Sequence, residues 1–166
     1  MIIIGYDGSQ DAKSAIARAG ELLTGEPTTV LTVWEAFEDV MVRTGAGWGG
    51  LVPGMSDLEE IDRSYEQSAR ERAEEGVGLA RSAGLDARPS TQKRSDTIAQ
   101  AILAEADRVE ARAVVLGSRG LTGIKSLFLG SVSHAVLQHA DRPVLVVPSP
   151  EVARERADHR HRRDDS

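Results

Sequence analysis

Residues 113–147 read AVVLGSRGLTGIKSLFLGSVSHAVLQHADRPVLVV. An apolar run leads into the glycine turn Gly117-Ser118-Arg119-Gly120, and after nine further residues Gly130-Ser131 opens a second apolar segment. The pattern predicts a strand, a glycine turn, a loop, a helix and a final strand. The first turn of a helix carries unpaired amide groups and the positive end of the helix dipole. Gly130-Ser131 is therefore predicted to form an anion site beside the turn.

The rest of the chain repeats the alternation of strand and helix. Strands are expected at residues 2–6, 28–34, 85–91, 113–116 and 143–147, with helices after residues 9, 57, 95 and 131. This order predicts an α/β fold: a doubly wound, open, parallel five-stranded sheet with helices on both faces, as in Rossmann-like proteins. The glycine-rich connection from Glu35 to Met55 is expected to be the least regular part.

Two turns of the predicted sheet fall at the carboxyl ends of strands. The first strand ends in Tyr6-Asp7-Gly8-Ser9, and the fourth ends at Gly117. In a doubly wound sheet the first and fourth strands can be neighbours at the switch point, where ligands bind. The two turns are therefore predicted to face one pocket. Asp7 can meet a sugar hydroxyl or a Mg²⁺ ion there, although an Asx turn or a helix cap would also explain it.

Composition narrows the class of protein. The chain has 166 residues, a net charge of −6 and no cysteine. An acidic chain is a poor nonspecific binder of nucleic acid, and no apolar run is long enough to span a bilayer. The amino terminus lacks the basic start and apolar run of a secretory signal. A cytoplasmic protein that binds neither nucleic acid nor membrane is expected.

The stretch from Gly117 resembles the universal stress protein family, in its ATP-binding branch. The spacing Gly-x2-Gly-x9-Gly-Ser, the segment Ala140 to Val147 and the turn Tyr6-Asp7-Gly8-Ser9 carry the resemblance, which covers roughly residues 1–148. It implies one domain over 1–148, related to the adenine nucleotide α-hydrolases. Residues 149–166 form a charged tail with five acidic residues, five arginines and two histidines, expected to be disordered or a frayed helix.

The resemblance also implies a set of ligand-binding residues. The backbones of Gly117, Gly120 and Gly130 and the Ser131 hydroxyl would hold the phosphates of ATP, with Mg²⁺ bound indirectly through Asp7. The backbone of Val33 would read the adenine edge. The other residues expected to line the site are Gly5, Tyr6, Leu116, Ser118, Arg119, Val132 and Ser133. Arg119 and Lys125 are the bases near the loop that can neutralise phosphate charge, although a solvated surface position explains Lys125 equally well.

Several motifs are interpreted as carrying no chemistry. The segment Gly45 to Gly50 matches G-x-G-x-x-G, but no strand directly precedes it and Pro53-Gly54 follows, so a loop is the better account. His134 and His139 lie five apart, a spacing that does not stack them on one helix face. The sequence has neither a Walker A loop nor a nucleophile elbow.

The expected function is that of a nucleotide-dependent regulator in stress responses. No residue set resembles a catalytic base placed to activate water, so at most slow ATP hydrolysis is expected. An enzyme that cleaves ATP to AMP and pyrophosphate stays open as an alternative, as does a nucleotide-free partner-binding module. The apolar run Val144 to Val147 is expected to form an edge strand through which two copies pair as a homodimer.

Overall fold

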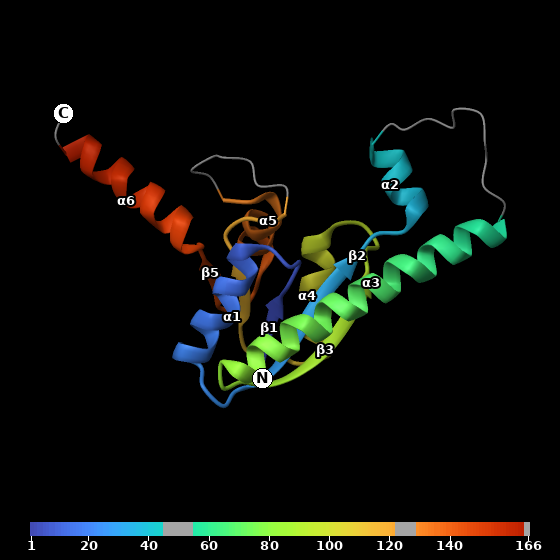
Figure 1. Ribbon diagram of the computed structural model, residues 1–166, viewed down its shortest axis with the longest axis horizontal. Helices are drawn as coiled ribbons and strands as arrows, with labels where there is room; N and C mark the ends of the chain where they lie inside the picture. Colours follow the sequence, from blue (N-terminus) through green and yellow to red (C-terminus); the bar gives the residue numbers. More distant parts are fainter. Residues whose placement is uncertain (45–54, 122–128, 165–166) are drawn as a thin grey trace.

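The computed structural model describes residues 1–44, 55–121 and 129–164, and Figure 1 shows their arrangement. The elements are, in chain order, β1 (Ile2–Gly5), α1 (Gln10–Leu22), β2 (Pro27–Trp34), α2 (Phe37–Thr44), α3 (Met55–Ser82), β3 (Asp86–Lys93), α4 (Ile98–Arg108), β4 (Val114–Gly117), α5 (Ser131–His139), β5 (Val144–Val147) and α6 (Pro150–Asp164). The strands form a five-stranded sheet in the order β3-β2-β1-β4-β5, and every adjacent pair is parallel. The predicted fold class is confirmed.

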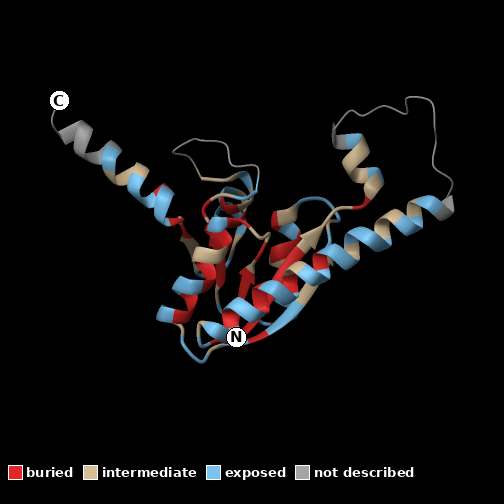
Figure 2. Cartoon of the chain, in the orientation of Figure 1, coloured by how far each residue is buried: buried red, intermediate tan, exposed pale blue. Residues whose placement is uncertain are grey.

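Two apolar layers cover the sheet, because successive strand residues point to opposite faces. Ile2 and Ile4 of β1 pack with α1 and α3, whereas Ile3 between them packs with α4 and α5. Both faces are therefore buried, which explains the continuous apolar runs of β1 and β4. Figure 2 shows the buried residues concentrated in the strands and on the inward sides of the helices.

The switch point lies between β1 and β4. Ile3 is in register with Val114 and Ile4 with Val115, while the other edge of β1 pairs with β2. The chains after β1 and β4 therefore leave the sheet side by side, as the sequence predicted. β5 pairs with β4 alone among the described strands, so its predicted edge position is confirmed.

The connection after β2 is more regular than expected. Residues 37–44 form helix α2, whose first amide, that of Phe37, donates to Asp62 Oδ1 of α3 at 2.8 Å. The expectation of an irregular segment over all of Glu35 to Met55 is therefore wrong for this part. α3 begins at Met55, two residues before the expected start. The G-x-G-x-x-G segment lies outside the described residues.

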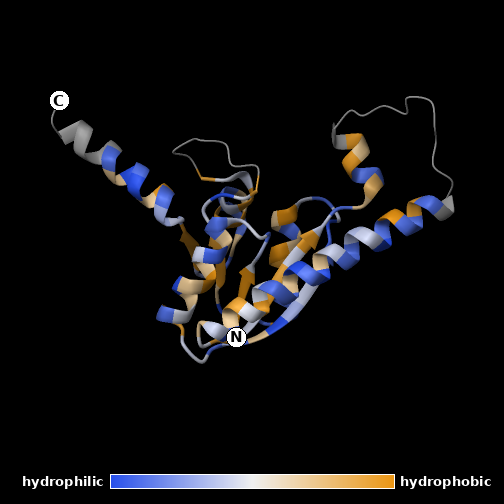
Figure 3. Ribbon diagram, viewed as in Figure 1, coloured by the Kyte–Doolittle hydropathy of each residue, from blue (hydrophilic) through white to orange (hydrophobic). Residues whose placement is uncertain are grey.

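The C-terminal tail contains helix α6. Of the two expectations for this tail, disorder or a frayed helix, the structure therefore shows a helix. Ser149 begins it by accepting the Val152 amide on its hydroxyl and the Ala153 amide on its carbonyl. Val152 is 4% exposed, and this residue anchors the start of the helix. Beyond it α6 extends away from the sheet (Figure 1), and Figure 3 shows how hydrophilic it is. None of the helices in the described part is both long and apolar enough to cross a membrane.

A buried carboxylate ties α4 to the edge strand β3. The Glu105 side chain is fully buried and accepts hydrogen bonds from Ser90 Oγ at 2.6 Å and Gln92 Nε2 at 2.9 Å. Arg108, one turn along α4, donates to both carboxylate oxygens at 2.6 Å. Burial opposes ionisation of Glu105, but these hydrogen bonds outweigh it and hold its pKa below the ordinary value.

Candidate functional site

The turn after β1 places a carboxylate against the glycine loop. Gly8 has a φ of +85°, a conformation that favours glycine, and it lets the chain turn sharply into α1. Asp7 Oδ1 then accepts the Ser9 amide at 2.9 Å, while Asp7 Oδ2 accepts the Leu121 amide at 3.2 Å. A β-carbon on Gly120 would lie 2.8 Å from that same Oδ2. Asp7 and Gly120, far apart in sequence, are thus in contact.

A second carboxylate, that of Asp11, organises the same loop. Asp11 lies in the first turn of α1 and is 6% exposed. Its Oδ2 accepts the Ser118 hydroxyl at 2.7 Å and the Arg119 amide at 3.0 Å. The cap itself is Ser9, whose hydroxyl accepts the Ala12 amide. The sequence contains only a weak indication of this role, since Asp11 is simply an acid in the first helical turn after Asp-Gly-Ser.

Gly117 lets β4 end directly against α1. A β-carbon there would lie 2.7 Å from the Ala12 nitrogen, closer than any side chain tolerates. The loop is also tied to its other neighbours, since the Ser118 amide donates to Val147 O at 2.8 Å. Gly117 is therefore required by close packing, whether or not a ligand is present.

The start of α5 lies over the loop, as predicted. Gly130 is the N-cap and has no side chain to cap the helix; its amide donates to Ser118 O at 2.8 Å. Ser131 is exposed and Val132 partly so. The first-turn amides of Ser131, Val132 and Ser133 have no acceptors within the helix. They form a group of donors with the positive end of the helix dipole behind them.

The Ser133 hydroxyl is already engaged. It donates to Gly117 O at 2.7 Å, and the residue is 5% exposed. The side chain that the resemblance placed on the wall of the site thus links α5 to β4. The Ser133 amide lies in the first turn of α5, beside Ser131, which is exposed.

The remaining predicted residues contribute backbone rather than side chains. Tyr6 and Leu116 are 2% and 4% exposed, and each belongs to an apolar core. A β-carbon on Gly5 would lie 2.6 Å from Leu116 Cδ2, so these two residues pack against each other. Val33 is partly buried near the carboxyl end of β2. Tyr6 and Leu116 thus belong to the cores on opposite faces of the sheet, and Gly5 packs against Leu116.

The Tyr6 phenol lies between α1 and α3. Its hydroxyl is buried and has no hydrogen-bond partner among the described residues. Burial raises the pKa of Tyr6, and the nearby Glu75 carboxylate raises it further. Glu75 is held by Lys13 of α1 at 3.1 Å, and a hydrogen bond from Lys13 lowers its pKa. Tyr6 is therefore a neutral residue beneath the turn at all physiological pH values.

The basic residues of the site divide into two groups. Arg119 is mostly buried and its Nη2 lies 2.9 Å from Glu155 Oε2 of α6. Arg72 of α3 passes Gly8, where a β-carbon would lie 3.7 Å from its Nε. Lys125 lies outside the described residues. Positive charge thus reaches the edge of the sheet from the loop and from α3.

The fit of the site to Mg²⁺ follows from its donor set. The described residues contain no group of three or more His, Cys, Asp or Glu side chains that could hold a metal ion. Asp7 is the carboxylate at the meeting point of the two turns. Mg²⁺ usually keeps several waters and is bound largely through substrate phosphates, so Asp7 fits an indirect role, in which it accepts a hydrogen bond from a water on a phosphate-borne ion.

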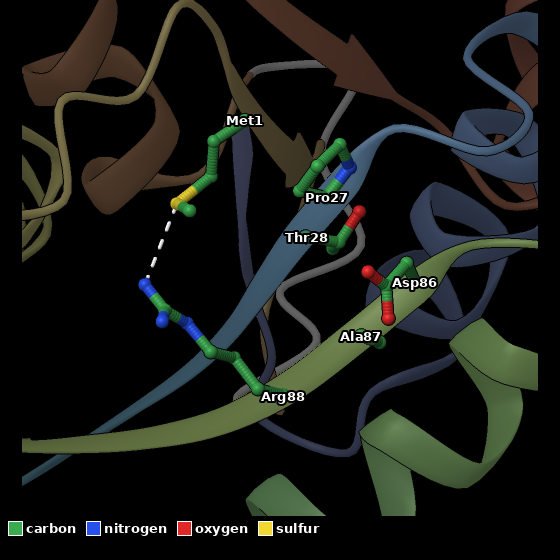
Figure 4. A pocket seen from close by; sticks show the side chains of 6 residues that line it. All are labelled: Met1, Pro27, Thr28, Asp86, Ala87 and Arg88. Carbon is green, nitrogen blue, oxygen red and sulfur yellow. Dashed lines mark hydrogen bonds between the residues drawn. The ribbon is translucent and has the colours of Figure 1, made fainter.

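A separate small pocket opens at the other end of the sheet (Figure 4). It has a volume of about 260 Å³ and is lined by Met1, Pro27, Thr28, Asp86, Ala87 and Arg88. Pro27 and Asp86 begin β2 and β3, so this pocket lies at the amino ends of the strands. The close-up shows Arg88 reaching the Met1 sulfur, at 3.5 Å. It takes no part in the glycine site.

Comparisons with known proteins identify the family and the fold. The model of the universal stress protein family matches residues 1–148. A universal stress protein from Thermus aquaticus is 33% identical over 153 residues, covering 88% of this chain and 96% of that protein.

Solved structures share the fold. A universal stress protein from Archaeoglobus fulgidus, in complex with dAMP, gives a TM-score of 0.58 at 23% identity, covering 88% of this chain and 95% of that one. A protein of the same family from Arabidopsis thaliana with AMP bound gives 0.59 at 18% identity, covering 89% and 90%. With its glycine loop, its α5 amides and these matches, the chain belongs to the universal stress protein family.

Proposed function

We propose that this protein binds ATP, together with Mg²⁺, at the carboxyl edge of its sheet. The main support for this proposal is the first turn of α5, which supplies the amides of Ser131, Val132 and Ser133. These amides lie beside a loop that has no side chains at Gly120 and Gly130. Such a turn is a ready site for phosphate. The dAMP and AMP bound by the Archaeoglobus and Arabidopsis proteins support an adenine nucleotide in particular.

The phosphates would bind the α5 amides, the Ser131 hydroxyl and the backbone around Gly120 and Gly130. Asp7 would take a ribose hydroxyl or a water on a phosphate-bound Mg²⁺ ion. The backbone near Val33, at the end of β2, would meet the adenine edge. Gly117, Leu116, Gly5 and Tyr6 would lie beneath these groups, where a β-carbon on Gly117 would meet Ala12 and one on Gly5 would meet Leu116.

The site suits a nucleotide-dependent regulator better than a hydrolase. A general base must be free to accept a proton from water. Asp7 and Asp11 contact the glycine loop from the turn after β1 and from α1, and both accept hydrogen bonds from loop donors instead. Slow hydrolysis of ATP is the most that this arrangement supports.

The assembly follows from the edge strand. Residues 1–148 would form the nucleotide-binding domain of a cytoplasmic homodimer, with α6 as an addition to it. β5 exposes part of Val144, Leu145 and Val146 along its free edge, and an apolar edge strand readily pairs with a second copy.

The test is direct identification of the ligand. Purified protein is heat-denatured and the released small molecules are separated by chromatography, and the emptied protein is titrated with ATP and AMP by calorimetry, with and without Mg²⁺. We expect adenine nucleotide in the released fraction and ATP binding that Mg²⁺ strengthens. Absence of any heat of binding for both nucleotides, in protein that unfolds cooperatively, would overturn the proposal.

A further inference from the structure

The backbone of Arg119 is part of the glycine loop, whereas its side chain contacts the C-terminal helix α6. Its amide is held by Asp11 Oδ2 at 3.0 Å, and a β-carbon on Gly130 would lie 3.4 Å from its Cα. The backbone of Arg119 is therefore fixed against the start of α5. Its guanidinium donates to Glu155 of α6.

The guanidinium has unused hydrogen-bonding capacity. Nη2 donates to Glu155 Oε2 at 2.9 Å, whereas the buried Nε has no acceptor among the described residues. The Arg119 side chain is 13% exposed and that of Glu155 is 43% exposed. A guanidinium binds phosphate through two parallel donors, so a single exposed carboxylate contact is a weak competitor for it.

The helix that carries Glu155 is attached to the domain by few groups. The Ser149 cap and buried Val152 fix its start, and Arg119 holds it one turn further along. The residues between are exposed, and Figure 1 shows α6 leaving the body of the molecule from this point. α6 also lies beyond the residues that the family model matches. Loss of the Arg119 contact would weaken the attachment of α6 beyond its first turn.

We propose that Glu155 acts as an internal stand-in for a phosphate, which holds Arg119 until a polyphosphate takes its place. This inference rests on the proposed function, because the phosphate chain is what reaches the start of α5. Binding of the polyphosphate draws Arg119 from Glu155 and frees α6 beyond its first turn. Because coupling between two sites is reciprocal, whatever weakens the Arg119–Glu155 pair strengthens polyphosphate binding by the same factor.

The affinity test compares Glu155→Gln with Glu151→Gln in the full-length chain. Both remove one negative charge from α6, but Glu151 is exposed and forms no ion pair with Arg119. ATP and inorganic tripolyphosphate are titrated by calorimetry. We expect Glu155→Gln to tighten both by about 2- to 5-fold, the range measured for breaking such pairs, and Glu151→Gln to change them less. In an Arg119→Gln background the difference between the two variants should disappear.

A second measurement follows the helix itself. Trypsin cleavage at the exposed Arg154 should accelerate when tripolyphosphate or ATP is bound, whereas cleavage at exposed Arg63 and Arg70 of α3 should not. Equal effects of the two glutamate variants, or a Glu155 effect that survives Arg119→Gln, would overturn the inference while leaving nucleotide binding intact. If tripolyphosphate binds with the expected pattern but ATP and AMP do not bind, the nucleotide proposal fails and the inference stands. If none of the three binds, both fail.

Discussion

Asp11 of α1 and Ser118, the residue after β4, are joined by a buried hydrogen bond of 2.7 Å although 107 positions separate them in the sequence. The same carboxylate oxygen also takes the Arg119 amide. The shape of the glycine loop is therefore set by an acid on a different element. The spacing of the glycines in the sequence does not indicate that this acid is involved.

The first prediction concerns that acid. Asp11→Ala should lower the free energy of unfolding by about 1–3 kcal/mol, because it leaves two buried donors without an acceptor. It should also weaken ATP binding by loosening the loop. Asp11→Asn keeps an oxygen and removes a charge near the phosphates, so ATP should bind at least as tightly as to the unchanged protein. Urea denaturation and calorimetry measure the two effects.

Asp86→Ala provides the control, since Asp86 is an exposed acid at the start of β3. It should change neither stability nor affinity noticeably. A stable Asp11→Ala protein with full ATP affinity would show that the loop holds its shape without this carboxylate.

The second prediction concerns the bare surface of the loop. In the double variant Gly120→Val, Gly130→Val, one side chain would crowd Asp7 Oδ2 and the other Ser118 O, 2.8 and 3.1 Å from the first added carbons. ATP binding should fall below detection while the far-UV circular dichroism stays largely unchanged, because both positions lie outside the strands and helices.

Gly78 supplies the matched control for these glycines. It lies on the exposed side of α3, and a β-carbon there meets nothing within 4 Å. Gly78→Ala should raise stability by about 0.5–1 kcal/mol through helix propensity and leave ATP affinity as it was. Retained ATP binding in the double variant would contradict the phosphate site.

The third prediction concerns the buried carboxylate of α4. Glu105→Gln should lower the free energy of unfolding at pH 7 by about 1–3 kcal/mol, since the hydrogen bonds to a charged acceptor are weakened. The pKa of Glu105 in the folded protein lies below its ordinary value of 4.5. The unfolded chain therefore takes up the proton first, and the contribution is complete above that value and lost as pH falls through the folded pKa.

Chemical denaturation at several pH values between 7 and 3 tests this dependence. The difference in the free energy of unfolding between the wild-type protein and Glu105→Gln should become smaller as the pH drops below 4.5. Glu60→Gln, at an exposed position of α3, should show no such difference. A difference of constant size across the series would mean that the charge of Glu105 is not what stabilises the β3–α4 contact.

The fourth prediction concerns the free edge of the sheet. Val146 is only partly buried in the single chain, so Val146→Arg should be tolerated by the fold while placing a charge on the proposed dimer strand. We expect a dimer to become a monomer by light scattering at low micromolar concentration. Thr91→Arg, on the opposite edge strand β3, should leave the dimer intact. If the wild-type protein is already a monomer under these conditions, the proposed pairing through β5 is contradicted.

Local patterns in the sequence predicted the elements that carry the site. The apolar runs before Asp7 and Gly117 gave two parallel strands, and Gly130 marked the start of α5 to within one residue. Their convergence followed from the topology of doubly wound sheets rather than from any single residue. These features are local, or follow from general rules of chain connection, and a sequence expresses them directly.

The features that sequence reasoning missed depend on tertiary contacts. The first amide of α2 is taken by Asp62 of α3, a residue 25 positions away, and glycines follow α2 along the chain. Asp11 acts on residues more than a hundred positions away. Glu105 offered a signal, since a charge falls on the helix stripe that also carries Ile102 and Val109, but its partners in β3 were not deducible.

The contact between Asp7 and the Leu121 amide has a consequence for how the protein handles a ligand. The Leu121 amide is already satisfied, so an incoming oxygen can bind this amide only by displacing the Asp7 carboxylate. The molecule then gains only the small surplus of one set of bonds over another. Such a swap favours rapid turnover of the occupant over permanent capture, and occupancy would follow the rise and fall of the surrounding supply.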